Sequence, residues 1–462
     1  MVSQAGEYIF IPETAFNALL DYSLDPSSDT GLNLNSKHII AGSDIDAPVE
    51  LLATKLRTRK GYLRNFTTLH MVVLTYCCNC QCDYCQASSI APSETGLHMS
   101  RVTARKVVDS IFCSPSPSVK IEFQGGEPTL NWDVLKGIVE YAEHLNRRKK
   151  KRLEFVLCSN LIHIDEGMVD FLARHKVLIS TSLDGPPDVH ELHRVCRDGA
   201  SSYEAFCASL RIVRQAMGQH SCSPLCTITK SSLGRLKDVI DEYLSLGFNG
   251  IFLRPVNPYG RARTQWDGLS SSVEEFVRAY RAALQYIIEI NVKGTFFVEY
   301  YAALMLTRIL TPFSTGFMDV QSPAGAGIMG VIYDSDGSVY PTDEARMLAR
   351  MGDATFRLGN VLTDSYEEIF LGAKLRDLVS SSCVESLPGC AWCAYNLYCG
   401  SDPIRYFVEC GDVVGHRPTS EFCMRNTGIL DYLFEMLEDD DNATRDVFWS
   451  WLTNRGLEAV RV

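Results

Sequence analysis

The sequence predicts an α/β protein built on a partial (β/α)6 TIM-like barrel, with a small N-terminal unit and a Cys-rich C-terminal extension. Between residues 67 and 255, short runs rich in β-branched residues alternate with amphipathic segments, and this alternation stops near residue 260. From residue 322 to 425 the chain becomes rich in Gly and Cys. Strands that alternate with helices predict a parallel sheet with the helices outside. Because only six units occur, the barrel is expected to be open.

The barrel elements follow from their residue patterns. Six strands are predicted at 68–74, 119–123, 153–158, 177–181, 224–229 and 250–255. Two of the helices between them have apolar residues at three-and-four spacing, at Val107, Val108 and Ile111 and again from Val134 to Ala142. Ser100 is the expected N-cap of the first of these helices.

The rest of the chain divides into shorter elements. A strand at 8–11 and a helix at 13–22 are expected in the N-terminal unit, helices over 271–310, and a hairpin at 333–340. An amphipathic helix is expected around Leu430 to Leu437. The predicted division is 1–66 (N-terminal unit), 67–265 (barrel), 266–315 (helical bridge), 316–428 (Cys-rich domain) and 429–462 (C-terminal helices).

Composition excludes several classes of protein. The net charge of −12 argues against non-specific nucleic-acid binding. No apolar stretch reaches the length of a membrane span, and the N-terminus lacks the pattern of a secretory signal. A cytoplasmic location is therefore expected. In a reducing compartment, 17 cysteines are expected to serve as metal ligands rather than disulfides.

Five of the cysteines fall in one short stretch, "LTYCCNCQCDYC" at 74–85. Only Cys78, Cys82 and Cys85 have the spacing C-x3-C-x2-C, whereas the bacterial ferredoxin spacing does not fit. A four-cysteine zinc knuckle is possible in principle, but five thiols this close give poor tetrahedral geometry. Cys77 and Cys80 fall outside the spacing and are expected to be packed rather than bound.

The segment "CNCQCDYC" after the first strand resembles the signature of the radical S-adenosylmethionine (radical SAM) enzymes. The resemblance implies that Cys78, Cys82 and Cys85 hold a [4Fe–4S] cluster with one open iron, which binds S-adenosylmethionine. One-electron cleavage then gives a 5′-deoxyadenosyl radical that abstracts a substrate hydrogen. Tyr84 is expected to shape the adenine side of the cofactor.

Three later segments match the same family. "FQGGEPTL" follows the second strand and resembles the stretch that contacts the methionyl amino group, which implies roles for Gly125, Gly126 and Glu127. After the third strand, "CSNL" places Asn160 at a strand's C-terminal end, where barrel sites are built. "STSLDGPPDVHELHR" resembles the segment whose Ser and Arg contact the ribose or carboxylate, here Ser182 and Arg194.

A second cysteine group, "CAWCAYNLYC" followed by "EFC", resembles the SPASM extension of peptide-modifying radical SAM enzymes. Ala324, Thr342 and Pro403 occupy positions where relatives with two auxiliary clusters have cysteines. One auxiliary [4Fe–4S] cluster is therefore expected, with zinc as the alternative at a four-thiolate site. The expected ligands are Cys390, Cys393, Cys399 and Cys423, and either Cys383 or Cys410 could replace Cys423.

Asp343 follows Thr342, at the place where sulfatase-maturing relatives have a general base. A salt-bridged surface turn is the alternative role for this residue. "IFLRPVNPYGRA", "SPAGAG" and "GHRPTSEFC" are most similar to radical SAM maturases of His-Xaa-Ser repeat systems. This similarity implies a precursor peptide as substrate, a second radical SAM maturase, and an electron donor such as flavodoxin or ferredoxin. The N-terminal unit is expected to help dock the peptide by β-augmentation.

Two other functions compete with peptide maturation. Formylglycine formation on a sulfatase requires the same Asp343, but those relatives carry the full second auxiliary cluster. The other alternative is a non-enzymatic iron–sulfur or zinc scaffold that binds a peptide, which the presence of a complete cofactor motif disfavours.

Overall fold

The computed structural model describes residues 1–42, 46–94, 97–439 and 441–460. It divides into two compact units, each assembled from segments that are distant in the sequence. One unit combines Met1–Leu63, Ala302–Gly325 and Ser380–Val462, and the other combines Arg64–Tyr301 with Ala326–Val379. The finer five-part division stays a prediction.

The larger unit is built on an open, mostly parallel sheet, which confirms the predicted α/β class. Within the described residues its strand order is β11-β10-β9-β1-β2-β3-β4-β5-β7. The strands are β1 (Leu69–Thr75), β2 (Ser118–Gly125), β3 (Arg152–Cys158), β4 (Leu178–Ser182), β5 (Cys222–Ile228), β7 (Leu253–Pro255), β9 (Gly330–Tyr333), β10 (Ser338–Tyr340) and β11 (Gly359–Asn360). All pairs from β9 to β7 are parallel. The carboxyl ends of these strands therefore lie at one edge of the sheet, where barrel sites form.

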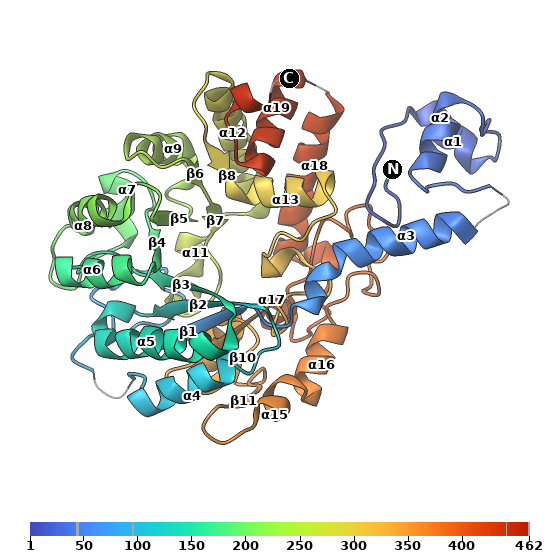
Figure 1. The fold of residues 1–462 in the computed structure, drawn as a ribbon. Helices are drawn as coiled ribbons and strands as arrows, with labels where there is room; N and C mark the ends of the chain where they lie inside the picture. The colour runs from blue at the N-terminus through green and yellow to red at the C-terminus, as the bar shows by residue number, and fades with distance from the viewer. Residues whose placement is uncertain (43–45, 95–96, 440, 461–462) are drawn as a thin grey trace. The chain divides into compact units, whose positions relative to one another are not determined.

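The predicted strands and helices of the barrel are present. Helices follow the strands along the outer side of the curved sheet (Figure 1). They are α4 (Arg101–Ile111), α5 (Trp132–Lys149), α6 (Glu166–Arg174), α7 (Pro187–His193), α8 (Ser202–Met217) and α9 (Leu236–Ser245). Ser100 caps α4 as expected, since its hydroxyl accepts a hydrogen bond from the Thr103 amide at 3.0 Å. The sixth predicted strand is split into β6 (Gly250–Ile251) and β7, and β6 pairs with β8 (Val298–Glu299).

Strand β1 lies in the interior of the sheet and is buried along most of its length. Six of its seven residues are buried, because β2 and β9 flank it and both of its faces are covered. A strand buried on both faces reads as a continuous apolar run, as "MVVL" does. The predicted hairpin at 333–340 is also present, as the antiparallel pair β9 and β10.

The helical predictions outside the barrel hold with changed boundaries. The stretch 271–310 forms α12 (Val273–Val292) and α13 (Tyr300–Leu310), which β8 separates. The smaller unit contains α1 (Glu13–Leu20), α2 (Asp29–Ser36), α3 (Asp46–Arg59), α17 (Pro403–Cys410), α18 (Glu421–Glu438) and α19 (Asn442–Thr453). Two short helices, α14 (Asp343–Arg350) and α15 (Tyr366–Phe370), belong to the larger unit.

The predicted strand at 8–11 is wrong. This segment forms a single isolated bridge, between Val2 and Tyr8. Its aromatic side chains instead pack on α18, where the Tyr8 ring lies 5.2 Å from that of Phe434. The aromatic residues of this apolar run, Tyr8 and Phe10, therefore serve side-chain packing.

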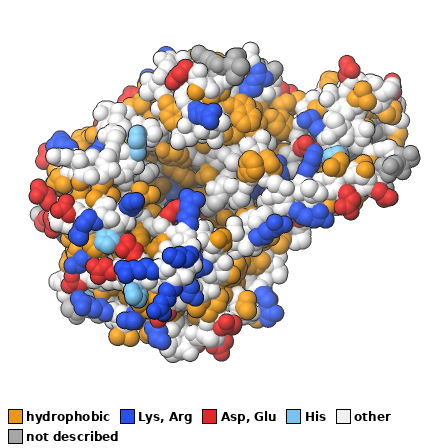
Figure 2. Space-filling view, in the orientation of Figure 1, with side chains coloured by type: hydrophobic (Ala, Val, Ile, Leu, Met, Phe, Trp, Pro, Cys, Tyr) orange, Lys and Arg blue, Asp and Glu red, His pale blue; other side chains and the backbone are white. Residues whose placement is uncertain are grey.

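Charge is unevenly distributed over the surface, despite the net charge of −12. In Figure 2, Lys and Arg side chains gather over α4 and α5, where Arg101, Arg105, Lys106, Arg147 and Arg148 are exposed. Among the described residues, no helix has the length and apolar character needed to cross a membrane.

Candidate functional site

The loop after β1 carries the five clustered cysteines at the carboxyl edge of the sheet. Four of them, Cys78, Cys80, Cys82 and Cys85, line one cavity. Cys77 is buried elsewhere, with its Sγ atom 3.5 Å from the Glu94 carbonyl and 3.5 Å from His98 Nε2. The structure thus brings the three predicted ligands together and adds Cys80 to the same wall.

Two arginines from later parts of the chain hold this loop through its backbone carbonyls. Arg197 Nε donates to the Cys78 carbonyl at 3.0 Å. Arg261 donates to the Cys82 carbonyl at 2.9 Å and to the Ser89 carbonyl at 2.7 Å. These contacts fix the backbone while leaving the thiols directed to the cavity.

The Gly-Gly pair after β2 is required by close approach to the cysteine loop. A Cβ atom on Gly126 would lie 2.3 Å from the Cys77 carbonyl oxygen, and one on Gly125 would lie 2.3 Å from that of Thr75. The Gly126 and Glu127 amides donate to the carbonyls of Thr75 and Cys77 at 2.7 and 2.8 Å. The glycines therefore let two backbone segments pair at the site.

The Glu127 carboxylate is buried and ties the loop after β2 to the loop after β3. It accepts hydrogen bonds from Thr129, from the Ser159 hydroxyl at 2.9 Å and from the Asn160 amide at 2.9 Å. Burial raises the pKa of Glu127, although these hydrogen bonds lower it in part. In this structure Glu127 positions the site, and its predicted contact with the cofactor's amino group stays a prediction.

Gly126→Ala is expected to destabilise the protein by about 1–3 kcal/mol, because the new methyl group meets rigid backbone. Chemical denaturation measures this change, and iron content after reconstitution reports on the cysteine loop. Gly137→Ala on α5 is the matched control, since nothing lies within 4 Å of its added Cβ. Equal unfolding of both variants and wild type would contradict the close-approach interpretation.

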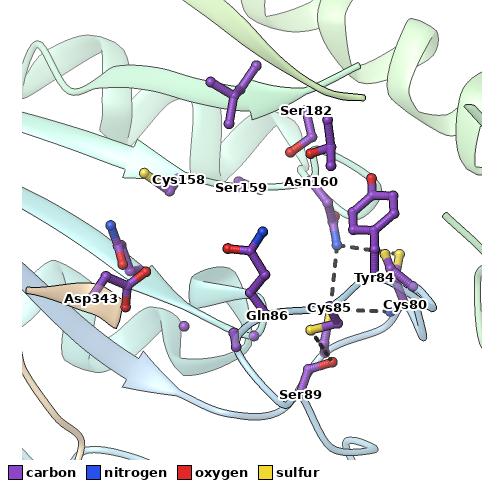
Figure 3. Close-up of a pocket in the computed structure, with 18 of the residues that line it drawn as sticks. Cys80, Tyr84, Cys85, Gln86, Ser89, Cys158, Ser159, Asn160, Ser182 and Asp343 are labelled. Atoms are coloured by element: carbon purple, nitrogen blue, oxygen red, sulfur yellow. Dashed lines mark hydrogen bonds between the residues drawn. The ribbon is translucent and has the colours of Figure 1, made fainter. Parts of the chain in front are cut away.

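The cavity has a volume of about 420 Å³ and lies across the carboxyl ends of β2 to β7. This is the size range of small-molecule sites. Besides the cysteines, predicted site residues line it: Tyr84, Gly125, Gly126, Asn160, Ser182, Arg194 and Asp343. Figure 3 shows Asp343 across the cavity from Cys80 and Cys85, with Gln86 between them. Glu127 is the predicted cofactor residue that does not reach the wall.

Arg194 is held in a buried ion pair at the cavity wall. Its Nε atom lies 2.9 Å from Asp184 Oδ2, and its guanidinium stacks 5.3 Å from the centre of the Tyr84 ring. The Tyr84 hydroxyl donates to the same Asp184 oxygen. Burial lowers the pKa of Arg194, but Asp184 and Tyr84 outweigh this and raise it. Arg194 is therefore a fixed cation facing the cavity.

Cys80 lies within hydrogen-bond range of both Cys78 and Cys82. The hydrogen bond from Cys80 lowers the pKa of Cys82 to about 7, with a further contribution from Arg194. The thiolate is the form of cysteine that binds metal. A lowered pKa favours the thiolate form of Cys82, which is the form that binds metal, and the Cys80 thiol donates the hydrogen bond that stabilises it.

Asp343 is the first residue of α14 and is fixed by a buried arginine. Arg346 donates to Asp343 Oδ1 through Nε at 2.7 Å and through Nη2 at 2.6 Å. Its Nη1 atom donates to the Tyr76 hydroxyl, which in turn donates to Asp334. The Asp343 carboxylate, which lines the cavity, is therefore oriented by a network that reaches Tyr76 and Asp334, the residues that directly follow β1 and β9.

The second cysteine group lies in the smaller unit. Burial raises the pKa of Cys393, Cys399 and Cys423, and nearby Cys390 raises each of them further. Such thiols are protonated at neutral pH without a metal, and metal binding would release their protons. The four predicted ligands are thus close enough to interact electrostatically.

The two alternative fourth ligands have other neighbours. Cys410 is exposed, with its Sγ atom 3.1 Å from the Tyr406 carbonyl, and Cys383 lies beside Glu385 and Lys60. Cys423 interacts with both Cys390 and Cys393. This arrangement favours Cys423. At one of the positions lacking a cysteine, the Thr342 hydroxyl caps α14 by accepting from the Ala345 amide at 3.1 Å.

Both sites contain buried polar atoms that have no hydrogen-bond partner among the described residues, and a bound group could supply one. Asn79 Nδ2 and Thr181 Oγ1 at the first site, and both terminal nitrogens of Arg417 at the second, are buried without a hydrogen bond to any described residue. Within the described chain, no three His, Cys, Asp or Glu side chains converge on one metal ion. An iron–sulfur cubane differs from one ion because each cysteine binds a separate iron. The residues present fit such a cluster.

Several of these residues were not identified from the sequence: Arg197, Arg261, Asp184, Arg346 and Arg417. Four of them act through contacts with residues far along the chain, which a local pattern does not reveal. Asp184, Arg261 and Arg417 lie within the segments "STSLDGPPDVHELHR", "IFLRPVNPYGRA" and "GHRPTSEFC", so their membership of family-like segments was the available signal.

Comparison with known proteins identifies the barrel. Residues 72–243 match the sequence model described as the Radical SAM superfamily, from within β1 to within α9. Residues 72–243 therefore match a radical SAM domain. This domain implies a [4Fe–4S] cluster and S-adenosylmethionine as cofactors, in agreement with the cysteine spacing.

Relatives extend over more of the chain. A cysteine-type anaerobic sulfatase-maturating enzyme of Clostridium perfringens is 22% identical over 324 residues, covering 68% of this chain and 83% of the relative. The structure of native anSMEcpe with bound AdoMet and Cp18Cys peptide has a TM-score of 0.67 at 20% identity, covering 81% of this chain and 98% of that one. Streptococcus suis SuiB bound to precursor peptide SuiA has a TM-score of 0.54 at 13% identity, covering 91% and 95%. These likenesses establish the fold.

Proposed function

We propose that the protein is a radical SAM enzyme that modifies a ribosomally made precursor peptide of His-Xaa-Ser type, giving a cross-linked or oxidised side chain. The observation that carries the proposal is a cavity at the carboxyl edge of the sheet. It places three correctly spaced cysteines on one wall and the Asp343 carboxylate on the other. A cavity with these two walls suits a reaction in which hydrogen abstraction is followed by proton removal.

In this proposal Cys78, Cys82 and Cys85 hold the [4Fe–4S] cluster. When bound, the cluster and S-adenosylmethionine supply a radical that abstracts a hydrogen atom from the peptide. Asn160, Ser182, Arg194 and the Gly125–Gly126 backbone line the space for S-adenosylmethionine, and Tyr84 borders it. The fixed cation of Arg194 suits a carboxylate.

Asp343 acts as general base in this proposal. A base must reach the proton that it removes and be ionised at the working pH. Arg346 orients the Asp343 carboxylate through two nitrogens, and the N-terminus of α14 also favours its negative charge. Arg346 is thus a positioning residue, with Tyr76 and Asp334 behind it.

The smaller unit would hold one auxiliary [4Fe–4S] cluster through Cys390, Cys393, Cys399 and Cys423. Its function in the proposal is to accept the second electron when the substrate is oxidised. The cluster needs four thiolates. Because burial raises the pKa of Cys393, Cys399 and Cys423, these three thiols release their protons when iron binds.

The peptide substrate is supported by structural neighbours that have peptides bound, Cp18Cys in one and SuiA in the other. Residues 1–66 remain the proposed docking unit, although they lack the predicted strand at 8–11 for β-augmentation. A second radical SAM maturase and a flavodoxin or ferredoxin as electron donor complete the proposed system.

Formylglycine formation on a sulfatase is the second candidate. The similarity to sulfatase-maturating enzymes over 324 residues favours it, as does an acid at position 343. Ala324, Thr342 and Pro403, where those relatives have cysteines, count against it. A Cys-containing sulfatase peptide and a His-Xaa-Ser precursor peptide, assayed in parallel, separate the two candidates.

The test is anaerobic reconstitution followed by reaction with dithionite, S-adenosylmethionine and the precursor peptide. About eight irons per chain are expected, since two cubanes hold four each. 5′-Deoxyadenosine and a peptide of altered mass should appear together. Wild-type protein that forms no 5′-deoxyadenosine would be a scaffold and not an enzyme. About four irons with bound zinc would assign zinc to the second site, and about twelve irons would contradict a single auxiliary cluster.

A further inference from the structure

Arg417 is a buried arginine that contacts the second cysteine group. Only 8% of the residue is exposed. Its Nε atom donates to Cys390 Sγ at 2.8 Å, and its guanidinium stacks 4.2 Å from the centre of the Tyr406 ring. Arg417 also lies close enough to Cys423 for their charges to interact. It therefore touches one proposed ligand and faces another.

The other two nitrogens of the Arg417 guanidinium, Nη1 and Nη2, are buried and donate no hydrogen bond to any described residue. Leaving a charged donor buried and unpaired is strongly unfavourable, so such groups normally have an anionic or polar partner. Tyr406 covers one face of the guanidinium but accepts none of these protons. A cluster on the neighbouring cysteines Cys390 and Cys423 would supply such a partner.

The chain makes specific room for this side chain. Gly389 directly precedes Cys390, and a Cβ atom there would lie 3.2 Å from Arg417 Cγ. Its φ of +77° is also one that L side chains rarely adopt. The glycine thus permits both the turn into the first ligand and the approach of the arginine.

We propose that Arg417 is a buried cationic hydrogen-bond donor to the auxiliary [4Fe–4S] cluster and raises its reduction potential. The proposal rests on the proposed function, which places that cluster on the four cysteines. A cubane with four thiolates carries negative charge, and one-electron reduction adds more without making or breaking a covalent bond. A fixed cation and hydrogen bonds to sulfur favour the reduced form.

A raised reduction potential suits the auxiliary cluster to accept electrons during the reaction. A cluster with a raised potential accepts an electron from a strongly reducing substrate radical more readily. The guanidinium is held by Cys390 and Tyr406, so its charge is in place before reduction and needs no rearrangement.

The experiment uses the full-length chain with Cys78, Cys82 and Cys85 all changed to Ser, reconstituted anaerobically, so that the auxiliary cluster alone gives the EPR signal. The midpoint potential is measured by redox titration in this parent, with Arg417→Met, Arg417→Lys and Arg445→Met added separately. Arg445 lies exposed on α19 in the same unit, so its charge is screened by solvent.

Arg417→Met is expected to lower the midpoint potential of the cluster. At the parent's midpoint potential, the ratio of oxidised to reduced cluster should rise at least tenfold, which corresponds to a shift of about 59 mV for a one-electron couple. Arg417→Lys should give a smaller shift, because it keeps the charge but loses the fork of donors. Arg445→Met should give none. An unshifted potential in Arg417→Met, or an equal shift in Arg445→Met, overturns the proposal.

A second measurement detects the contact between Arg417 and the cluster directly. In parent protein labelled with ¹⁵N-arginine, pulsed EPR of the reduced cluster should detect coupling to guanidinium nitrogen, and Arg417→Lys should remove it. Absence of coupling overturns the inference about Arg417 while leaving the cluster in place. A parent that binds no iron would instead refute the auxiliary cluster of the proposed function, and the inference with it.

Discussion

Asp343→Asn is expected to lower formation of the modified peptide by about 10²- to 10⁴-fold, the usual contribution of a general base. Asparagine keeps the size of the side chain, and its carbonyl oxygen can still accept from Arg346. The fold and the cavity should therefore persist while the proton acceptor is lost. Because Asp343 lies across the cavity from the cysteines, formation of 5′-deoxyadenosine should continue near the wild-type rate.

The measurement is parallel chromatography of 5′-deoxyadenosine and mass spectrometry of the peptide in one reaction. Asp353→Asn is the matched control, since Asp353 is half-buried shortly after the same helix and its carboxylate accepts a hydrogen bond from the Thr355 amide. Full conversion of the native peptide by Asp343→Asn would remove Asp343 as base. Parallel loss of both products would instead show that the residue supports cofactor binding.

The elements of the barrel could be predicted because each depends on local pattern. The strands β1 to β5 are short β-branched runs, and α4 and α5 have apolar stripes that match their buried faces. The spacing of Cys78, Cys82 and Cys85 similarly reflects one tight loop, which the structure places at the carboxyl edge of the sheet. Each of these features depends on residues that are close together in the sequence, so a local pattern predicts it.

The supports of the site could not be predicted, because they arise from contacts between distant residues. Arg261 lies 179 residues after Cys82 and binds its backbone carbonyl, so nothing in the cysteine motif indicates its partner. Arg346 donates to the hydroxyl of Tyr76, 270 residues earlier. Arg261 lies within the family-like segment "IFLRPVNPYGRA", but its contact with the cysteine loop appears only in the assembled fold.

The Glu127 side chain shows how a correct motif can leave the role of a residue open. The Gly-Gly-Glu segment was identified from the sequence, with the glycines expected to allow close approach. The structure shows that the close approach is to the backbone of Tyr76 and Cys77, and that the Glu127 carboxylate is buried in hydrogen bonds to two loops. The sequence predicted where the Gly-Gly-Glu segment lies, whereas the direction of the Glu127 side chain depends on tertiary packing.

Cys82→Ser is expected to abolish formation of 5′-deoxyadenosine and to lower iron from about eight to about four atoms per chain, since one cubane of four irons loses a ligand. Cys82 is the thiol whose pKa is lowered to about 7 by Cys80, and a serine hydroxyl does not supply a comparable thiolate. Iron analysis after anaerobic reconstitution and chromatography of the nucleoside measure both effects. Cys77→Ser is the control, because Cys77 packs against Glu94 and His98 away from the cavity.

Cys80→Ser makes the same test sharper, because Cys80 lines the cavity beside two proposed ligands. Spacing excludes Cys80 from the cluster, whereas proximity alone would allow it. If spacing decides, Cys80→Ser retains about eight irons and still forms 5′-deoxyadenosine, since the serine hydroxyl can replace the thiol as a hydrogen-bond donor to Cys82. Loss of iron in Cys80→Ser together with retention in Cys82→Ser would assign the cluster to a different set of three cysteines. The iron contents of Cys80→Ser and Cys82→Ser therefore decide which of these two neighbouring cysteines is a cluster ligand.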